Sequence, residues 1–160
     1  MNPFILLFDF RGRINRAKFW LAALVYIVVL FGVTGVAMAV SGSLTSVIAT
    51  TLLAYIVLLI SAAAVGVKRL HDRNKSAWWL ALFAIPVILP FIAALLDWLL
   101  QPETSAPFVA LQYLSFAISI WALIELGGLR GTIGANRYGN DPLRPAPAVP
   151  RSLTRARSPG

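Results

Sequence analysis

The sequence predicts an all-α membrane protein with four transmembrane helices, short loops and a disordered C-terminal tail. Composition is the first observation: hydrophobic residues make up 59% of the 160 residues and charged residues only 12%, whereas soluble domains carry about 25% charged residues. A soluble domain of this size would lack the polar residues needed to cover its core. The second observation is that four separate segments are apolar over about 20 residues, the length that a helix needs to cross the hydrocarbon core.

The four predicted spans cover residues 19–40, 47–67, 78–100 and 108–126. The first two contain no charged residue, and the other two carry one acid each, Asp97 and Glu125. Both acids lie within about one turn of a predicted helix end, where a charge costs well below its mid-bilayer value. We therefore expect residues 1–142 to form one transmembrane domain.

The segments outside the spans differ in character. Residues 3–10 are too short to cross a membrane and are expected to lie at its surface. Short polar turns over residues 41–46 and 101–107 connect neighbouring spans. Residues 143–160 are rich in Pro and Arg and lack apolar periodicity, which predicts a disordered tail. The chain contains no cysteine, and this excludes disulfides, thiol catalysis and cysteine metal sites.

The distribution of positive charge predicts the orientation. All 14 Lys and Arg residues lie before the first span, between the second and third, or after the fourth. With four crossings these three segments share one side, and an excess of Lys and Arg marks that side as cytoplasmic. We therefore expect both the N- and the C-terminus in the cytoplasm. The same sorting suggests that the net charge of +8 faces anionic lipid and not nucleic acid.

Tryptophans agree with this orientation, because their rings favour membrane–water interfaces. Trp20, Trp78 and Trp79 fall at the predicted inner interface. Trp98 falls at the outer one. We expect these four side chains to anchor the helices at the two surfaces.

Three polar blocks meet the membrane on the predicted cytoplasmic side. Their sequences are FRGRINRAKFW at residues 10–20, KRLHDRNKSAWW at residues 68–79 and GTIGANRYGNDP at residues 131–142. The candidate site residues in these blocks are groups that could bind one another or an anion: Arg13, Arg16, Arg69, His71, Asp72, Ser76, Asn136, Arg137, Tyr138 and Asp141.

The three blocks resemble the signature segments of the domain-of-unknown-function 805 family, small bacterial inner-membrane proteins. The family pattern reads approximately F-x-G-R-x-x-R-x-x-F/Y-W, then R-R-L-H-D-x-G-x-S-G-W-W, then G-x-x-G-x-N-x-Y-G-x-D-P. The likeness extends from about residue 8 to residue 142, with departures at Lys68, Asn74 and Ala77. The resemblance implies a four-span protein of the bacterial inner membrane and carries no assigned activity.

Residues 68–76 are expected to form a cytoplasmic loop. Lys68 and Arg69 would follow the second span directly, where the helix dipole and the headgroup phosphates both favour cations. Asn74 stands where the family pattern has glycine, and Asn is the next-best residue for a left-handed backbone position. Ser76 is a natural N-cap for the third span.

Contacts between the blocks are also expected. Asp72 lies among many cations and should pair with Arg13, Arg69 or Arg137. Residues 136–139 can fold back as a turn beneath the bundle, where they would offer amide, guanidinium and phenol donors.

We favour a structural interpretation, in which these groups hold the three cytoplasmic segments together and bind anionic lipid. A specific site for a small anion, a lipid headgroup or a protein partner is the next interpretation, because Arg suits phosphate and carboxylate. Catalysis is least favoured. His71 and Asp72 are adjacent, neighbours one apart do not face each other on a helix, and no nucleophile accompanies them. A lone His without Cys gives little support for a metal, and no cofactor is expected.

The sequence therefore favours a non-enzymatic membrane protein that binds lipid headgroups, a membrane protein partner or a second copy of itself. A small transporter or channel subunit is the alternative. Transport normally requires ionisable or polar groups near mid-membrane, and the span centres offer only Thr, Ser and Gln side chains that can bond within or between helices. A third hypothesis, an enzyme acting on lipid phosphates, would depend on His71 and Asp72.

Overall fold

The structure is a computed structural model that describes residues 3–86, 88–89 and 106–144. This part of the chain is helical, which confirms the all-α prediction. Its elements are α1 (Pro3–Phe8), α2 (Arg16–Val40), α3 (Leu44–Asp72), α5 (Ala106–Leu123) and the π-helical segment η1 (Ile124–Gly128). Residues 79–86 and 88–89 are helical as well.

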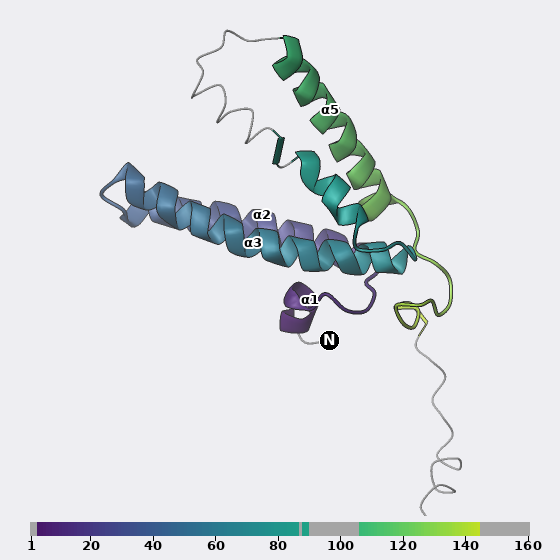
Figure 1. Ribbon diagram of the computed structural model, residues 1–160. Coiled ribbons are helices and arrows are strands. Elements are labelled where there is room, and N and C mark those ends of the chain that lie inside the picture. The colour runs from purple at the N-terminus through teal and green to yellow at the C-terminus, as the bar shows by residue number, and fades with distance from the viewer. Residues whose placement is uncertain (1–2, 87, 90–105, 145–160) are drawn as a thin grey trace, which may run out of the picture.

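The helices form two arms that meet at one end (Figure 1). In the first arm, α2 and α3 pair as a long antiparallel hairpin, with the short α1 packed on α3. In the second arm, α5 runs alongside the helical residues 79–86 (Figure 1). The arms join near the C-terminal end of α3, and the irregular segment 129–144 passes the same end (Figure 1).

Three helices of the described residues are long and apolar enough to cross a membrane: Arg16–Val40, Leu44–Asp72 and Val109–Gly128. The predicted span over residues 78–100 is described only in part, and that part is helical from residue 79. The remainder, with Asp97 and Trp98, lies outside the described residues, as does the predicted tail from residue 145 onward. The chain is thus a multi-pass helical protein.

Polar caps place the starts of α2 and α3 a few residues earlier than hydropathy did. The Asn15 side chain accepts a hydrogen bond from the Lys18 amide at 3.0 Å, so α2 begins at residue 16 and not at 19. The Ser43 side chain accepts one from the Ser46 amide at 3.3 Å, so α3 begins at residue 44 and not at 47. Each cap satisfies an N–H that has no partner inside its helix.

The end of α3 corrects the loop predicted over residues 68–76. α3 continues through Asp72, so residues 68–72 are helical. The chain then turns at Asn74, whose φ of 58° is the left-handed conformation expected of this position. The first charged residues after the apolar segment do not end the helix, because the charged side chains of its last turn bind partners within the protein.

Lys68 shows this directly, because its ammonium group holds α1 in place. Lys68 Nζ donates to the carbonyls of Ile5 at 2.9 Å and Leu6 at 2.5 Å. The Ser61 hydroxyl donates to the Leu7 carbonyl at 2.8 Å. The last carbonyls of a helix lack N–H donors within it. The Lys68 and Ser61 side chains supply donors to the end of α1. Lys68 is only 2% exposed, so its ammonium group is bound within the protein.

Two small apolar clusters support the joint between the arms. One contains the buried residues Ile14, Ala22 and Val65, and the other contains Leu70, Phe83 and Leu126. Away from the joint, the long hairpin exposes large apolar side chains such as Phe31 and Val40. The buried charges, in contrast, lie at the joint. This is the reverse of a soluble protein, in which charges face outward.

Candidate functional site

The candidate site is the polar junction, which we define as the Arg13, Arg69, Asp72 and Glu125 side chains together with the segment 129–141. Asp72 lies at its centre. Arg13 contacts Asp72 Oδ1 through Nε at 3.1 Å and through Nη2 at 3.0 Å, and Arg69 Nη1 donates to Oδ2. The three side chains are at most 4% exposed. Two of the three predicted partners of Asp72 are therefore found.

Arg13 joins the first polar block to the third. Besides its bonds to Asp72, it donates from Nη1 to the carbonyls of Gly134 at 2.7 Å and Gly139 at 3.1 Å. From Nη2 it donates to the Thr132 carbonyl at 2.7 Å. A guanidinium group has five N–H donors, and these contacts use all of them. Arg13 is thus fully occupied by the protein itself.

Arg69 reaches in the other direction, to the end of η1. Its Nε donates to the Leu126 carbonyl at 2.6 Å, and its Nη2 donates to the Leu129 carbonyl. Carbonyls at a helix end lack partners within the helix, and a buried cation is well suited to satisfy them. With the bond to Asp72, Arg69 makes three hydrogen bonds from five donors. Arg69 is completely buried.

The backbone at residues 131–132 packs directly against Asp72. The Thr132 amide and hydroxyl both donate to the Asp72 carbonyl, at 2.8 Å and 2.9 Å. At Gly131 an added Cβ would lie 1.9 Å from Asp72 Oδ2, so no larger residue fits without a shift. Neither Gly131 nor Thr132 is among the site residues predicted from the sequence. The glycine at the start of the third block was the only signal for this close approach.

A second buried ion pair was missed by the sequence analysis. Glu125, which is 4% exposed, accepts hydrogen bonds from Arg73 Nε at 2.6 Å and Lys75 Nζ at 2.8 Å. Lys75 also lies over the Trp79 ring, 4.3 Å from its centroid. An acid within an apolar span requires a partner, so Glu125 could have been assigned to the cluster on that ground.

The third block folds back as the predicted turn. Asn136 and Gly139 exchange two backbone hydrogen bonds of 3.0 Å. The Asn136 side chain donates to the His71 carbonyl at 2.9 Å, and the Tyr138 ring stacks on the His71 ring at 3.8 Å between centroids. Arg137 does not pair with Asp72. It stacks on Tyr138 and donates to the Asn74 carbonyl at 3.1 Å.

Asp141 fixes the end of this turn. Its Oδ1 accepts from the Leu143 amide at 2.9 Å, and its Oδ2 accepts from the Gly134 amide at 3.0 Å. These hydrogen bonds, that from Leu143 first, hold the pKa of the Asp141 carboxyl below its ordinary value. The role of Asp141 is thus local and structural in this arrangement.

The side chains of His71 and Asp72 contact different partners. The His71 Nδ1 lies 3.3 Å from the Gly12 carbonyl, and the Asp72 carboxylate is directed at two arginines. Within the described residues, no three His, Asp or Glu side chains come together as a metal site. The Ser76 carbonyl accepts a hydrogen bond from the Trp79 amide at 3.3 Å. No hydrogen bond of the Ser76 hydroxyl is found among the described residues. The predicted side-chain cap is therefore not seen.

The tryptophans take different positions. Trp20 is half-exposed, and its indole N–H donates to the Gly127 carbonyl at 3.1 Å, which joins α2 to η1. Trp78 is exposed, as an anchor would be. Trp79 packs edge-on against Trp121, with centroids 5.8 Å apart. The fourth predicted anchor, Trp98, lies outside the described residues.

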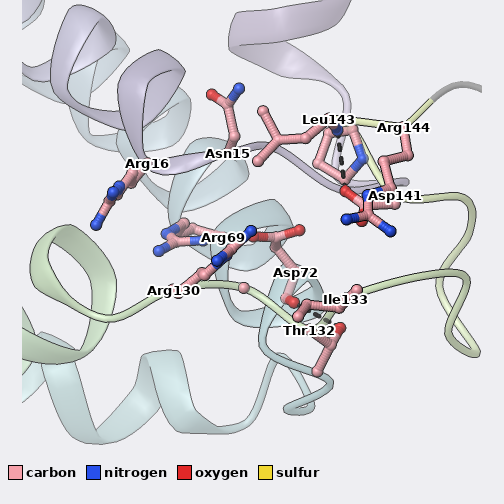
Figure 2. A pocket seen from close by; sticks show the side chains of 12 residues that line it. Asn15, Arg16, Arg69, Asp72, Arg130, Thr132, Ile133, Asp141, Leu143 and Arg144 are labelled. Carbon is pink, nitrogen blue, oxygen red and sulfur yellow. Dashed lines mark hydrogen bonds and ion pairs between the residues drawn. The ribbon is translucent and has the colours of Figure 1, made fainter.

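A cavity of about 290 Å³ opens beside the junction, and we call it the arginine cavity (Figure 2). It lies between the start of α2 and the segments 130–133 and 141–144. Its charged lining consists of four arginines and two aspartates: Arg16, Arg69, Arg130, Arg144, Asp72 and Asp141. Both carboxylates already accept hydrogen bonds from the protein, so the cavity carries surplus positive charge.

The chain is similar in sequence to members of one protein family. Residues 7–140 match the model of a family described as "Protein of unknown function (DUF805)". The Escherichia coli K12 protein YiiR, named as uncharacterized, is 34% identical over 135 residues, which cover 84% of this chain and 86% of YiiR. The E. coli K12 inner membrane protein YhaH is 31% identical, over 83% of this chain and 86% of YhaH. No solved structure matches the chain.

Proposed function

This chain belongs to the DUF805 family, and on that premise we propose that it is a non-enzymatic, four-span protein of the bacterial inner membrane whose cytoplasmic face binds anionic lipid headgroups. The relative YhaH is named an inner membrane protein. Both termini lie in the cytoplasm in this proposal, and residues 78–100 supply the remaining span. The positively charged segments then share the cytoplasmic side, as the positive-inside rule requires.

The observation that carries the proposal is the division of the cations into two groups. Arg13, Lys68 and Arg69 are buried and bonded to protein groups. Arg16, Arg130 and Arg144 are exposed and line the arginine cavity. Among the described residues, no ion pair or side-chain hydrogen bond to protein is found for these three guanidinium groups. Each cation near an anionic surface adds about 1 kcal/mol of attraction.

The polar side chains of the long hairpin support this function over transport. The Thr34 and Thr51 hydroxyls lie 3.3 Å apart, and the Tyr26 and Ser61 hydroxyls lie 2.9 Å apart. Both contacts join α2 to α3, so these groups stabilise the hairpin and leave few donors for a solute.

The topology is tested by reporter fusions to the full membrane domain. Fusions after Gly42 and Glu103 should report the periplasm, and fusions after Asn74 and Arg144 should report the cytoplasm. A reversed pattern would contradict the orientation, and a cytoplasmic signal at Glu103 would contradict a membrane crossing by residues 78–100.

Lipid binding is tested by native mass spectrometry of the purified, delipidated protein. Phosphatidylglycerol should be retained in preference to zwitterionic phosphatidylcholine. Equal retention of the two lipids would refute the proposed function. The same spectra report any second copy or co-purified partner.

A further inference from the structure

The arginine cavity has the properties of a discrete site as well as those of a charged surface. Its volume of about 290 Å³ is near the lower end of pockets that hold small molecules, which run from about 300 Å³ upward. Arg16, Arg69 and Arg130 approach it from one side, and Arg144 approaches from the other (Figure 2). Like charges gathered in this way repel each other, and a bound anion would relieve that repulsion.

The base of the cavity contains a buried donor with unused capacity. Arg69 is 0% exposed and lines the cavity. Its three hydrogen bonds go to the Leu126 carbonyl, the Leu129 carbonyl and Asp72. Two of its five N–H donors therefore have no acceptor among the described residues. Unpaired donors of a buried guanidinium group are costly, and a ligand oxygen would satisfy them.

The N-terminal end of α2 adds to the positive electrostatic potential of the cavity. Asn15 and Arg16 line the cavity, so the first turn of this 25-residue helix faces it. The positive end of a helix dipole favours an anion at this position. The two acids of the lining do not oppose an anion strongly, because Asp72 is bonded to two arginines and Asp141 to two backbone amides.

We propose that the arginine cavity binds one phosphate group, which contacts the exposed Arg16, Arg130 and Arg144 and the unused donors of Arg69. Guanidinium groups match phosphate oxygens in pairs, which favours phosphate over a spherical anion such as chloride. Either an anionic phospholipid headgroup or a soluble phosphate compound supplies this chemistry. The lipid source rests on the proposed function, whereas the soluble source does not.

The test compares three forms of the full-length protein in detergent: wild type, Arg16→Gln/Arg130→Gln, and Arg11→Gln. The double variant removes two exposed cations of the cavity. Arg11 is also exposed, on the same polar block, but does not line the cavity, so it is the matched control. The probes are phosphatidylglycerol, measured by native mass spectrometry, and inorganic phosphate, measured by the shift in melting temperature at constant ionic strength.

The double variant should bind whichever probe the wild type binds about tenfold or more weakly, because charge-assisted hydrogen bonds to the phosphate are lost. The control should change by less than about twofold, as expected of a screened surface charge. If the double variant fails to fold, Arg144→Gln should show a loss in the same direction. Retention of wild-type affinity for both probes in the cavity variants, or an equal loss in the control, would overturn the proposal.

The two probes separate this inference from the proposed function. A preference for phosphatidylglycerol over phosphatidylcholine that is insensitive to the cavity variants would refute the site and leave the proposed function standing. Cavity-dependent binding of inorganic phosphate without any lipid preference would support the site and refute the proposed function. Cavity-dependent retention of phosphatidylglycerol alone would identify the lipid headgroup as the source.

Discussion

Replacement of Gly131 by alanine tests whether the polar junction depends on direct contact between Asp72 and the third block. An added Cβ would lie 1.9 Å from Asp72 Oδ2 and 2.5 Å from its Cγ. Real Cβ atoms do not approach other atoms this closely, so one of the two must move. The Asp72 carboxylate is not a flexible chain end, since Arg13 and Arg69 hold both of its oxygens.

The expected loss follows from what each movement breaks. If the carboxylate moves, two buried guanidinium groups lose their counter-charge, and breaking a buried pair costs about 3–5 kcal/mol. If the segment 131–132 withdraws instead, Thr132 loses two hydrogen bonds to the Asp72 carbonyl, at about 0.5–1.5 kcal/mol each. The bond from Arg13 to the Thr132 carbonyl is then lost as well, at about 1.5–3 kcal/mol. Either route therefore costs roughly 2.5–6 kcal/mol.

Gly128→Ala is the matched control, because an added Cβ there meets nothing within 4 Å. Its effect should stay within about 1 kcal/mol of wild type. Thermal unfolding of the detergent-purified variants, followed by circular dichroism, measures the difference. At about 2–4 °C per kcal/mol for a chain of this size, Gly131→Ala should melt roughly 5–20 °C below Gly128→Ala. Melting temperatures of the two variants within about 2 °C of each other would refute the reasoning.

Three other predictions concern separate parts of the junction. Lys68→Met should release α1, because the carbonyls at its C-terminal end lose their ammonium donor, and hydrogen exchange of residues 3–8 should rise while that of α2 does not. Glu125→Gln should lower stability by about 1–2 kcal/mol in the same melting assay, since both of its cationic partners are partly exposed and solvent screens part of the loss. The lowered pKa of Asp141 means that its stabilisation of the turn is complete above the ordinary carboxyl pKa of about 3.9 and is lost as the pH falls through the lowered value. The amide chemical shift of Gly134 should follow this titration, and Asp141→Asn should abolish it; a shift that persists in the variant would assign it to another group.

The helical arms could be predicted from the sequence because length and hydropathy are local properties. Apolar segments of spanning length lead directly to α2, α3 and α5, and the described part of the third predicted span is helical too. The backbone conformation at one turn could also be predicted. Asn74 replaces a glycine of the family pattern, and it adopts the left-handed conformation that only a few residue types accept.

The polar junction was predictable only in part, because its contacts join residues far apart in the chain. Arg13 and the carbonyl of Gly134 are separated by 121 positions, and Glu125 and Arg73 by 52. Charge complementarity indicated that Asp72 has arginine partners, but it could not rank Arg13 and Arg69 above Arg137. A hydropathy pattern treats charged side chains as exposed, and for this reason it predicts a loop at residues 68–72, which are helical.

The buried cations change how the positive charge of this chain is interpreted. The positive-inside rule counts every Lys and Arg near a membrane end equally, yet Arg13 and Lys68 are buried and donate to backbone carbonyls and, from Arg13, to Asp72. We expect their removal to act on folding, because it leaves buried acceptors unpaired. Exposed cations such as Arg16, Arg130 and Arg144, which line the arginine cavity, are placed to attract an anion. In the proposed function, stability and lipid recognition therefore depend on different residues of the same polar blocks, and a substitution can alter one without the other.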